Sequence, residues 1–451
     1  MRDEPIPAKT WLMCIHSREL YAKRQAAVLD AISARGDDAV AVLPAAPVYV
    51  RNNDVDHDYR QDSDLHYLSG FAEPESALVL SAKGRKATMF VRPRDPEREV
   101  WDGPRAGVDG AKADFGADEA HPIKDLDEGL TKLFENVSRV YYRLGRNHAF
   151  DDALLRAIDR TRSRARMGIT WPTEIIDTGQ VLHEMRLFKA PSDLDAMRAA
   201  MSITEEAHLR AMRTAKPGMH EYEVEALLLE TFRRRGSDRP AYGSIVGSGP
   251  NATVLHYRAN NRKMEDGDLL LIDAGCEYDY YASDVTRTFP VSGKFTREQQ
   301  AIYELVLEAQ AAGIEATRPG ATLEEIHGKS VRTLTEGLVR LGLLSGAVDT
   351  LIEKEEYKPF YMHRTSHWLG MDVHDVGAYF VQGQARKLEP GMVLTVEPGI
   401  YIAKDYDKVA PEWRGIGVRI EDDILVTEKG PVNLTRAIPK TVPEIERACA
   451  A

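Results

Sequence analysis

The chain has 451 residues, of which 43% are hydrophobic and 29% are charged, a composition that supports ordinary buried cores in two or three domains. Its net charge of −12 at pH 7 argues against nucleic acid as a partner, because binding to phosphates needs a basic surface. A short basic cluster at residues 233–235 is typical of a solvated helix end.

Cysteine usage and apolar runs indicate the compartment. Cys14, Cys276 and Cys449 are far apart and form no CxxC pair, which argues against a disulfide framework and favours a reducing compartment. Residues 1–20 carry charges and prolines without an uninterrupted apolar stretch, so we expect no signal peptide. No run of about 18 apolar residues occurs in the sequence, so we expect no membrane span and no membrane partner. The expected location is the cytoplasm.

The first third of the chain has an α/β pattern. Hydrophobic periodicity and turn signals predict a helix over residues 18–33, a strand over 39–43 that ends at Pro44, and a further strand over 139–144. Residues 76–80 and 86–91 flank Lys83-Gly84, which predicts a hairpin.

A domain boundary is expected near residues 170–190. Beyond it, Pro191-Ser192 opens a long helical pattern, in which Ser192 and Asp195 predict a capping box. We therefore predict an α/β N-terminal domain over residues 1–182 and a second domain over residues 183–451.

The second domain contains an internal duplication. One copy opens with a Lys-Pro-Gly turn and the other with an Arg-Pro-Gly turn, and each turn precedes a helical stretch. In both copies a carboxylate stands six residues after a glycine, at the end of an apolar strand: Asp273 follows Gly267, and Glu397 follows Gly391. A second acid follows in each copy, Asp284 in the first and Glu421 in the second.

Two similar halves packed about a pseudo-two-fold axis would bring these four carboxylates together. Taken singly, each acid is more often a turn or cap residue, and a lone histidine such as His256 is more often a structural hydrogen-bonding group. The matching offsets in both halves favour a functional cluster, because independent turn residues have no reason to keep the same spacing.

Converging carboxylates predict a metal site, because buried acids must be paired, protonated or bound to a cation. Two divalent ions that share bridging carboxylates satisfy this requirement. The second half adds His363, His367 and His374 as nitrogen donors or proton carriers. An oxygen-rich set with one histidine suits Mn²⁺, with Co²⁺, Zn²⁺ or Fe²⁺ as alternatives. The other nearby acids are expected to be supporting or surface residues: Asp279, Asp372, Asp375, Asp422 and Asp423.

The C-terminal motifs resemble a known family. They are residues 272–278 (IDAGCEY), 283–290 (SDVTRTFP), 366–376 (SHWLGMDVHDV), 396–401 (VEPGIY) and 415–423 (GIGVRIEDD). In this order they are similar to the metal-dependent pita-bread peptidases. The resemblance implies an α+β pita-bread domain, of the creatinase/aminopeptidase type, with a pseudo-two-fold internal repeat. The metal ligands that it implies are Asp273 on one ion, Asp284 and Glu421 bridging both, and His367 and Glu397 on the second.

The N-terminal third resembles bacterial aminopeptidase P. The matching stretches are residues 43–54 (LPAAPVYVRNND), 60–71 (RQDSDLHYLSGF) and 73–80 (EPESALVL). The resemblance implies a metal-dependent exopeptidase that releases the N-terminal residue from peptides with proline in second position. The implied nucleophile is a hydroxide that bridges the two metal ions. Arg364 departs from the glycine that relatives often have after the equivalent of His363, which bears on the substrate pocket and not on the metal site.

The same resemblance implies further roles. Glu397 would pass a proton to the leaving nitrogen, and His374 would stabilise the oxyanion. His256 and His363 would line the site. The expected substrate-binding residues are Tyr401, Arg419, which also holds neighbouring carboxylates, and Trp101, which reaches from a neighbouring subunit. Relatives form homodimers or homotetramers, so self-association is expected.

Two alternatives remain open. A prolidase, which cleaves only Xaa-Pro dipeptides, uses the same five ligands, although the N-terminal motifs favour the aminopeptidase. A non-catalytic binding protein on the same scaffold would have lost metal ligands, and here all five are present. Their presence also argues against a creatinase-like activity.

Overall fold

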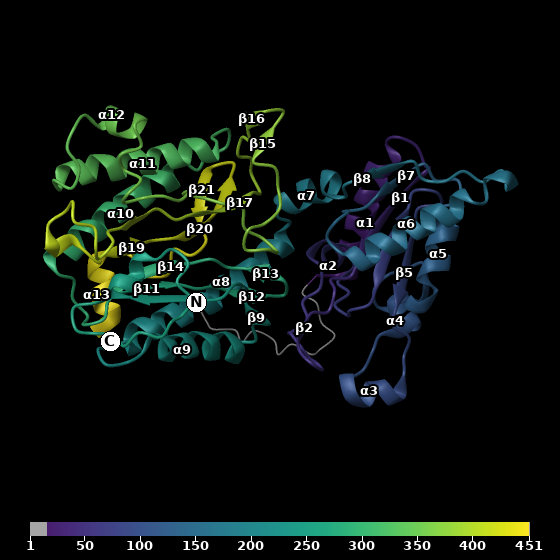
Figure 1. Cartoon of the computed structure of the whole chain (residues 1–451), viewed down its shortest axis with the longest axis horizontal. Helices are drawn as coiled ribbons and strands as arrows, with labels where there is room; N and C mark the ends of the chain where they lie inside the picture. The colour runs from purple at the N-terminus through teal and green to yellow at the C-terminus, as the bar shows by residue number, and fades with distance from the viewer. Residues whose placement is uncertain (1–15, 451) are drawn as a thin grey trace. The chain divides into compact units, whose positions relative to one another are not determined.

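The computed structural model describes residues 16–450, which form two compact units, one ending at Met185 and the other beginning at Arg186 (Figure 1). Cys14 and the residues before it, used above for the compartment and the signal peptide, lie outside the described residues. Among the described helices, none is long and apolar enough to cross a membrane.

The N-terminal unit is built on a six-stranded mixed sheet with strand order β6-β5-β4-β1-β7-β8. The strands are β1 (Ala39–Pro44), β4 (Ala77–Ser81), β5 (Lys86–Val91), β6 (Glu119–Pro122), β7 (Arg139–Tyr141) and β8 (Glu174–Ile176). β1 is central and almost fully buried, as expected for an uninterrupted apolar strand covered on both faces. A separate small hairpin joins β2 (Val50–Asn52) to β3 (Val55–Asp56).

Helices cover this sheet. They are α1 (Arg18–Ser33), α2 (Ser63–Ser69), α4 (Gly107–Ala113), α5 (Leu126–Leu133) and α6 (His148–Arg162). α3 (Pro96–Asp102), which has no buried residue, lies apart from the sheet (Figure 1). The predicted helix over residues 18–33 is confirmed as α1, and Ser17 caps it by accepting a hydrogen bond from Leu20 N–H. The predicted hairpin is confirmed as the antiparallel pair β4–β5. The strand predicted over residues 139–144 ends earlier, at Tyr141.

The C-terminal unit repeats one arrangement, a pair of helices followed by an antiparallel pair of strands. The first copy has α8 (Pro191–Thr214), α9 (Glu221–Arg234), β11 (Leu269–Asp273) and β14 (Thr286–Pro290), and the second has α10 (Arg297–Ala316), α11 (Leu323–Arg340), β17 (Val393–Val396) and β20 (Asp422–Thr427). In Figure 1 the strands β11, β14, β17 and β20 lie between α9 and α11. The turns that open the second helices match too, because Gly218 N–H donates to Met264 and Gly320 N–H donates to Leu388. The predicted duplication is therefore present as structure.

Shorter elements complete the C-terminal unit. The strands are β9 (Arg239–Pro240), β10 (Ile245–Ser248), β12 (Cys276–Tyr278), β13 (Tyr281–Ala282), β15 (Phe380–Val381), β16 (Gln384–Ala385), β18 (Gly399–Tyr401), β19 (Gly417–Arg419) and β21 (Gly430–Asn433). The helices are α12 (Val348–Glu353) and α13 (Val442–Ala450), and α7 (Gly179–Leu187) spans the boundary between the two units. Phe232, Ile272, Val306 and Ile400 belong to one hydrophobic core, so residues of both repeats pack together.

The expected capping box of α8 is wrong in its residues. Pro191 occupies the first helical position, where its missing N–H costs nothing, so the cap is Ala190 and not Ser192. The carboxylate that accepts from the Ala190 N–H, over 2.8 Å, is therefore Asp193. Asp195 lies two residues further along and pairs with Arg198 instead.

Candidate metal centre

The strand pairing of each repeat brings its two predicted carboxylates to the same end of a ladder. Asp273 is the last residue of β11, and Asp284 lies just before β14, whose Thr286 pairs with Asp273. In the second repeat Glu397 directly follows β17, and Glu421 directly precedes β20. Antiparallel pairing thus places the end of one strand beside the start of the next.

Gly275 allows the first pair of acids to approach. A Cβ atom at this position would lie 1.8 Å from the Ser283 carbonyl oxygen, so only glycine fits between the two chain segments. Cys276 follows and is fully buried, as expected for an apolar residue beside a site.

The structure brings all five predicted metal ligands together. Single ligand atoms of Asp284, His367 and Glu421 all lie within 4.8 Å of one another. His367 Nε2 is 3.4 Å from Asp284 Oδ2 and 3.6 Å from Glu397 Oε1. Asp273 joins the group through Tyr242, whose hydroxyl lies 2.6 Å from Asp273 Oδ1 and 2.5 Å from Asp284 Oδ1.

The orientation of His367 suits a metal ligand. Its Nδ1 lies 3.0 Å from the Trp368 carbonyl oxygen, and since a carbonyl only accepts, Nδ1 carries the hydrogen. Nε2, the atom that faces the carboxylates, is then the nitrogen that can bind a metal once it loses its proton. Histidine ligands are commonly oriented in this way by a hydrogen bond from the other ring nitrogen.

The electrostatics of the cluster also suit cations. Burial raises the pKa of Asp284 and Glu421, and the neighbouring carboxylates raise both further. Burial likewise raises the pKa of Glu397 to about 7. Burial disfavours a charge on His367, but the hydrogen bond with Asp284 and the charge of Glu397 raise its pKa to about 9. Four crowded acids and one imidazole are a donor set that divalent cations neutralise.

Arg419 and Thr286 support the carboxylates from behind. Arg419 Nη2 donates to Asp273 Oδ2 over 2.6 Å, and its Nε donates to Thr286 Oγ1 over 3.1 Å. Thr286 Oγ1 in turn donates to Glu421 Oε2 over 2.7 Å. One chain of contacts therefore links the first-repeat acid Asp273 to the second-repeat acid Glu421.

His363 and Tyr401 form a second layer beside Glu397. The Nδ1 of His363 donates to the Arg364 carbonyl, so its Nε2 accepts from the Tyr401 hydroxyl over 2.8 Å. Burial lowers the pKa of His363 to about 3, which keeps the ring neutral. Arg419 Nη1 donates to the same Tyr401 hydroxyl over 3.0 Å. Tyr401 therefore joins His363 to the support of the metal site.

The other predicted site residues lie at different distances from the cluster. The His374 ring packs against His367 with centroids 4.3 Å apart, and burial together with the charge of His367 lowers its pKa. His256 is exposed, and its charge lowers the pKa of both His363 and His374. Trp101 belongs to α3 of the N-terminal unit and is 84% exposed.

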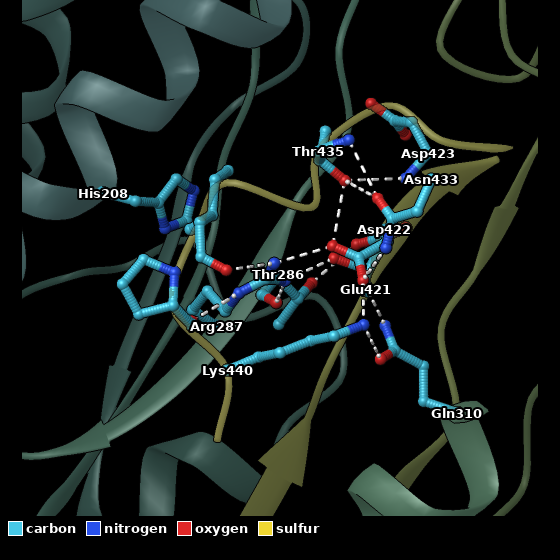
Figure 2. Close-up of polar contacts among 12 residues, drawn as sticks. His208, Thr286, Arg287, Gln310, Glu421, Asp422, Asp423, Asn433, Thr435 and Lys440 are labelled. Atoms are coloured by element: carbon cyan, nitrogen blue, oxygen red, sulfur yellow. Dashed lines mark hydrogen bonds and ion pairs between the residues drawn. The ribbon is translucent and has the colours of Figure 1, made fainter. Parts of the chain in front are cut away.

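Some residues that contribute to the candidate metal centre were missed in the sequence, and the role of others was left open. No sequence pattern singles out Tyr242, because it lies in a loop outside the repeated motifs. Asp422 and Asp423 are completely buried, so the surface alternative is wrong for them. Asp423 Oδ2 accepts from Asp284 N–H over 3.1 Å. Figure 2 shows Glu421 with the polar groups that surround Asp422.

Comparisons with known proteins agree with this geometry. The profile of metallopeptidase family M24 matches residues 195–428, and that of the N-terminal domain of aminopeptidase P matches residues 21–141. The Xaa-Pro aminopeptidase of Escherichia coli (strain K12) is 45% identical over 439 residues, covering 96% of this chain and 98% of the relative.

Solved structures extend the likeness to three dimensions. Aminopeptidase PepP of Pseudomonas aeruginosa is 54% identical with a TM-score of 0.95, covering 97% of this chain and 99% of that chain. The zinc-substituted aminopeptidase P of E. coli in complex with product is 44% identical with a TM-score of 0.93, covering 96% and 98%. With both domains matched in sequence and in fold, the chain belongs to metallopeptidase family M24 and carries an N-terminal domain of the aminopeptidase P type.

Proposed function

We propose that this protein is an Xaa-Pro aminopeptidase, which releases the N-terminal residue from peptides with proline in second position. The main support is the cluster of Asp284, His367 and Glu421, whose ligand atoms lie within 4.8 Å of one another, with Asp273 and Glu397 beside it. Relatives named Xaa-Pro aminopeptidase that match over nearly their whole length favour this specificity.

In this proposal the five clustered residues hold two divalent ions. Asp284 and Glu421 would be shared by both ions, Asp273 would hold one, and His367 and Glu397 would hold the other. When bound, the ions polarise the peptide carbonyl and lower the pKa of the attacking water. Mn²⁺ is the proposed metal because the donors are mostly oxygen, with Co²⁺, Zn²⁺ and Fe²⁺ as alternatives. The zinc-substituted E. coli relative supports a site that accepts more than one metal.

The remaining chemistry falls to side chains of this chain. Glu397 accepts a proton from the attacking water and delivers it to the leaving proline nitrogen. His374 donates a hydrogen bond to the oxygen of the carbonyl under attack, where negative charge develops. His256 lies at the exposed side of the site, where it lines the path of the peptide.

Selection of proline follows from the amide itself. An Xaa-Pro amide has no N–H, so a peptidase cannot recognise it through that hydrogen bond and must contact the ring. Neutral His363, packed edge-on against Tyr361 and held by Tyr401, offers an uncharged surface for this ring. We assign Tyr401 and Arg419 to the wall of the same pocket.

The decisive experiment measures hydrolysis and metal content on one sample. The substrates are an Xaa-Pro-Xaa tripeptide, an Xaa-Pro dipeptide and a matched Xaa-Ala-Xaa tripeptide. We expect release of the first residue from the proline tripeptide only with metal bound. Cleavage of the dipeptide alone would favour a prolidase. Stoichiometric metal without hydrolysis of any proline peptide would favour a binding protein.

Assembly and location are part of the proposal. We infer a homodimer or homotetramer in which the exposed Trp101 reaches the site of a neighbouring subunit. Sedimentation tests the assembly, and Trp101→Ala should raise KM without changing metal content if Trp101 contacts the substrate of a neighbouring subunit.

The cytoplasm is the proposed location, which cell fractionation tests. Limited proteolysis tests the proposed domain boundary at residues 182–183.

A further inference from the structure

Asp422, the residue after the proposed ligand Glu421, is the centre of a buried polar cluster in the C-terminal unit (Figure 2). We call this cluster the Asp422 hub. Its carboxylate accepts from Arg287 Nη2 at 2.6 Å, Thr435 Oγ1 at 2.9 Å, Lys440 Nζ at 2.5 Å, Asn433 Nδ2 at 2.7 Å and Gln310 Nε2 at 3.2 Å. A carboxylate with no exposed surface requires such partners, because an unpaired buried charge is very costly.

The hub lies behind the metal centre and not inside it. Consecutive side chains of extended backbone point to opposite faces, so Asp422 points away from the side that Glu421 occupies. Asp423 returns to the side of Glu421, where it accepts from Asp284 N–H. Asp422 is therefore not a further ligand, and its partners act on the centre through the backbone.

Arg287 carries the connection from the hub to Glu421. The same guanidinium that pairs with Asp422 donates from Nη1 to the Glu421 carbonyl over 2.6 Å and to the Thr286 carbonyl over 2.9 Å. Thr286 then donates from its hydroxyl to the Glu421 carboxylate over 2.7 Å. The main chain and the side chain of Glu421 are thus both held by groups that the hub orders.

The hub also ties a late segment of the chain to this position. Arg287 Nε donates to the Pro439 carbonyl over 3.0 Å and Nη2 to the Ile438 carbonyl over 3.2 Å. Lys440 reaches both Asp422 and Gln310 Oε1 of α10. Residues 433–440, which contain none of the predicted ligands, therefore contribute five of the contacts that fix Asp422 and Arg287.

The charge balance of the hub favours the same role. Two cations, Arg287 and Lys440, surround one anion, Asp422. The net positive charge of the hub lies behind Glu421, which has to stay close to the three other carboxylates of the proposed metal centre. Like charges at close range repel strongly in a buried site, so a nearby fixed cation reduces the cost of gathering them.

We propose that the Asp422 hub positions Glu421, and that residues 433–440 influence metal binding through the hub. This inference rests on the ligand assignments proposed above. Groups that orient a ligand from behind commonly change metal affinity by roughly 10–100-fold when they are removed. Metal affinity therefore tests the role of the hub without a measurement of turnover.

The test measures Mn²⁺ binding to the metal-free full chain by isothermal titration calorimetry. Lys440→Met removes one of the two hub cations while keeping the length of the side chain, and we expect Mn²⁺ affinity to fall about 10-fold or more. Lys440→Arg keeps a cation and should stay near wild type. Arg262→Met is the matched control, because Arg262 also pairs with a carboxylate, that of Asp268, and its side chain is 22% exposed against 23% for Lys440.

A purely structural hub predicts a different pattern. Lys440→Met would then lower Tm as Arg262→Met does, with Mn²⁺ affinity unchanged in both, and this result would overturn the proposal. If Lys440→Met does not fold, Thr435→Val removes another donor to Asp422 with little change of shape. Wild-type Mn²⁺ affinity in that variant would also overturn the proposal. Failure of the wild-type chain to bind Mn²⁺ would instead reject the metal assignments themselves, and the hub with them.

Discussion

Arg419 Nη2 donates to Asp273 Oδ2 over 2.6 Å, and this ion pair joins the second repeat of the C-terminal unit to the first. The same guanidinium reaches Tyr401 and Thr286, so one side chain orders both the proposed pocket and the proposed ligands. The fork of donors that does this is available to arginine and not to lysine.

Arg419→Lys should therefore weaken the site although the charge is kept. We expect metal affinity to fall about 10–100-fold, because Asp273 loses its orienting partner. Calorimetric titration with Mn²⁺ measures this directly. Arg414→Lys is the control, since Arg414 is held by backbone carbonyls away from the carboxylates. Equal affinities in the two variants would contradict the supporting role.

Asp284→Asn should abolish turnover and reduce bound metal, because an amide cannot supply the bridging negative charge that two cations require. Hydrolysis of an Xaa-Pro-Xaa peptide and metal content are measured on the same preparation. Asp405→Asn, at an exposed position, should behave as wild type. Chelation of the wild-type protein should also stop turnover, and near-normal activity without metal would refute the two-metal proposal.

His374→Ala should lower kcat more than it raises KM. The reason is that a hydrogen bond to a developing oxyanion strengthens mainly in the transition state, and losing one such donor costs about 100–1,000-fold in kcat. Metal content should not change, because His374 is not among the proposed ligands. A variant with a raised KM and an unchanged kcat would point to substrate binding instead.

The metal-free protein should become less stable as pH rises from 6.5 to 9. In the folded state the pKa of His367 is raised to about 9, so the folded chain binds more protons than the unfolded chain in this range, and that stabilisation disappears as pH passes through the raised pKa. Glu397, whose burial raises its pKa to about 7, acts in the same direction at the lower end of the range.

Bound metal should reverse this trend, because cations compete with protons for the same groups. The measurement is Tm with and without saturating Mn²⁺ at several pH values in this window. We expect the difference between the two Tm values to grow with pH. A difference that stays constant would show that neither His367 nor Glu397 loses its proton on binding.

Local patterns in the sequence were sufficient for much of the fold. Helix α1 and the β4–β5 hairpin follow from periodicity and turn residues within a short window. The duplication located the four carboxylates, because repeated offsets preserve the place of a residue relative to its strand. The start of α8 was misjudged for a local reason, since Pro191 moved the cap to Ala190.

Only the tertiary structure decided which side chains serve the carboxylates. Tyr242 contacts Asp273 and Asp284 from more than thirty positions away, and Lys440 reaches Asp422 from 18 positions away in a segment that no motif marks. Sequence by itself determined the acids and their order, because each belongs to a strand end with a recognisable pattern. Their supporting partners depend on how distant segments pack, and a polar contact between two distant segments leaves no periodic pattern along the chain.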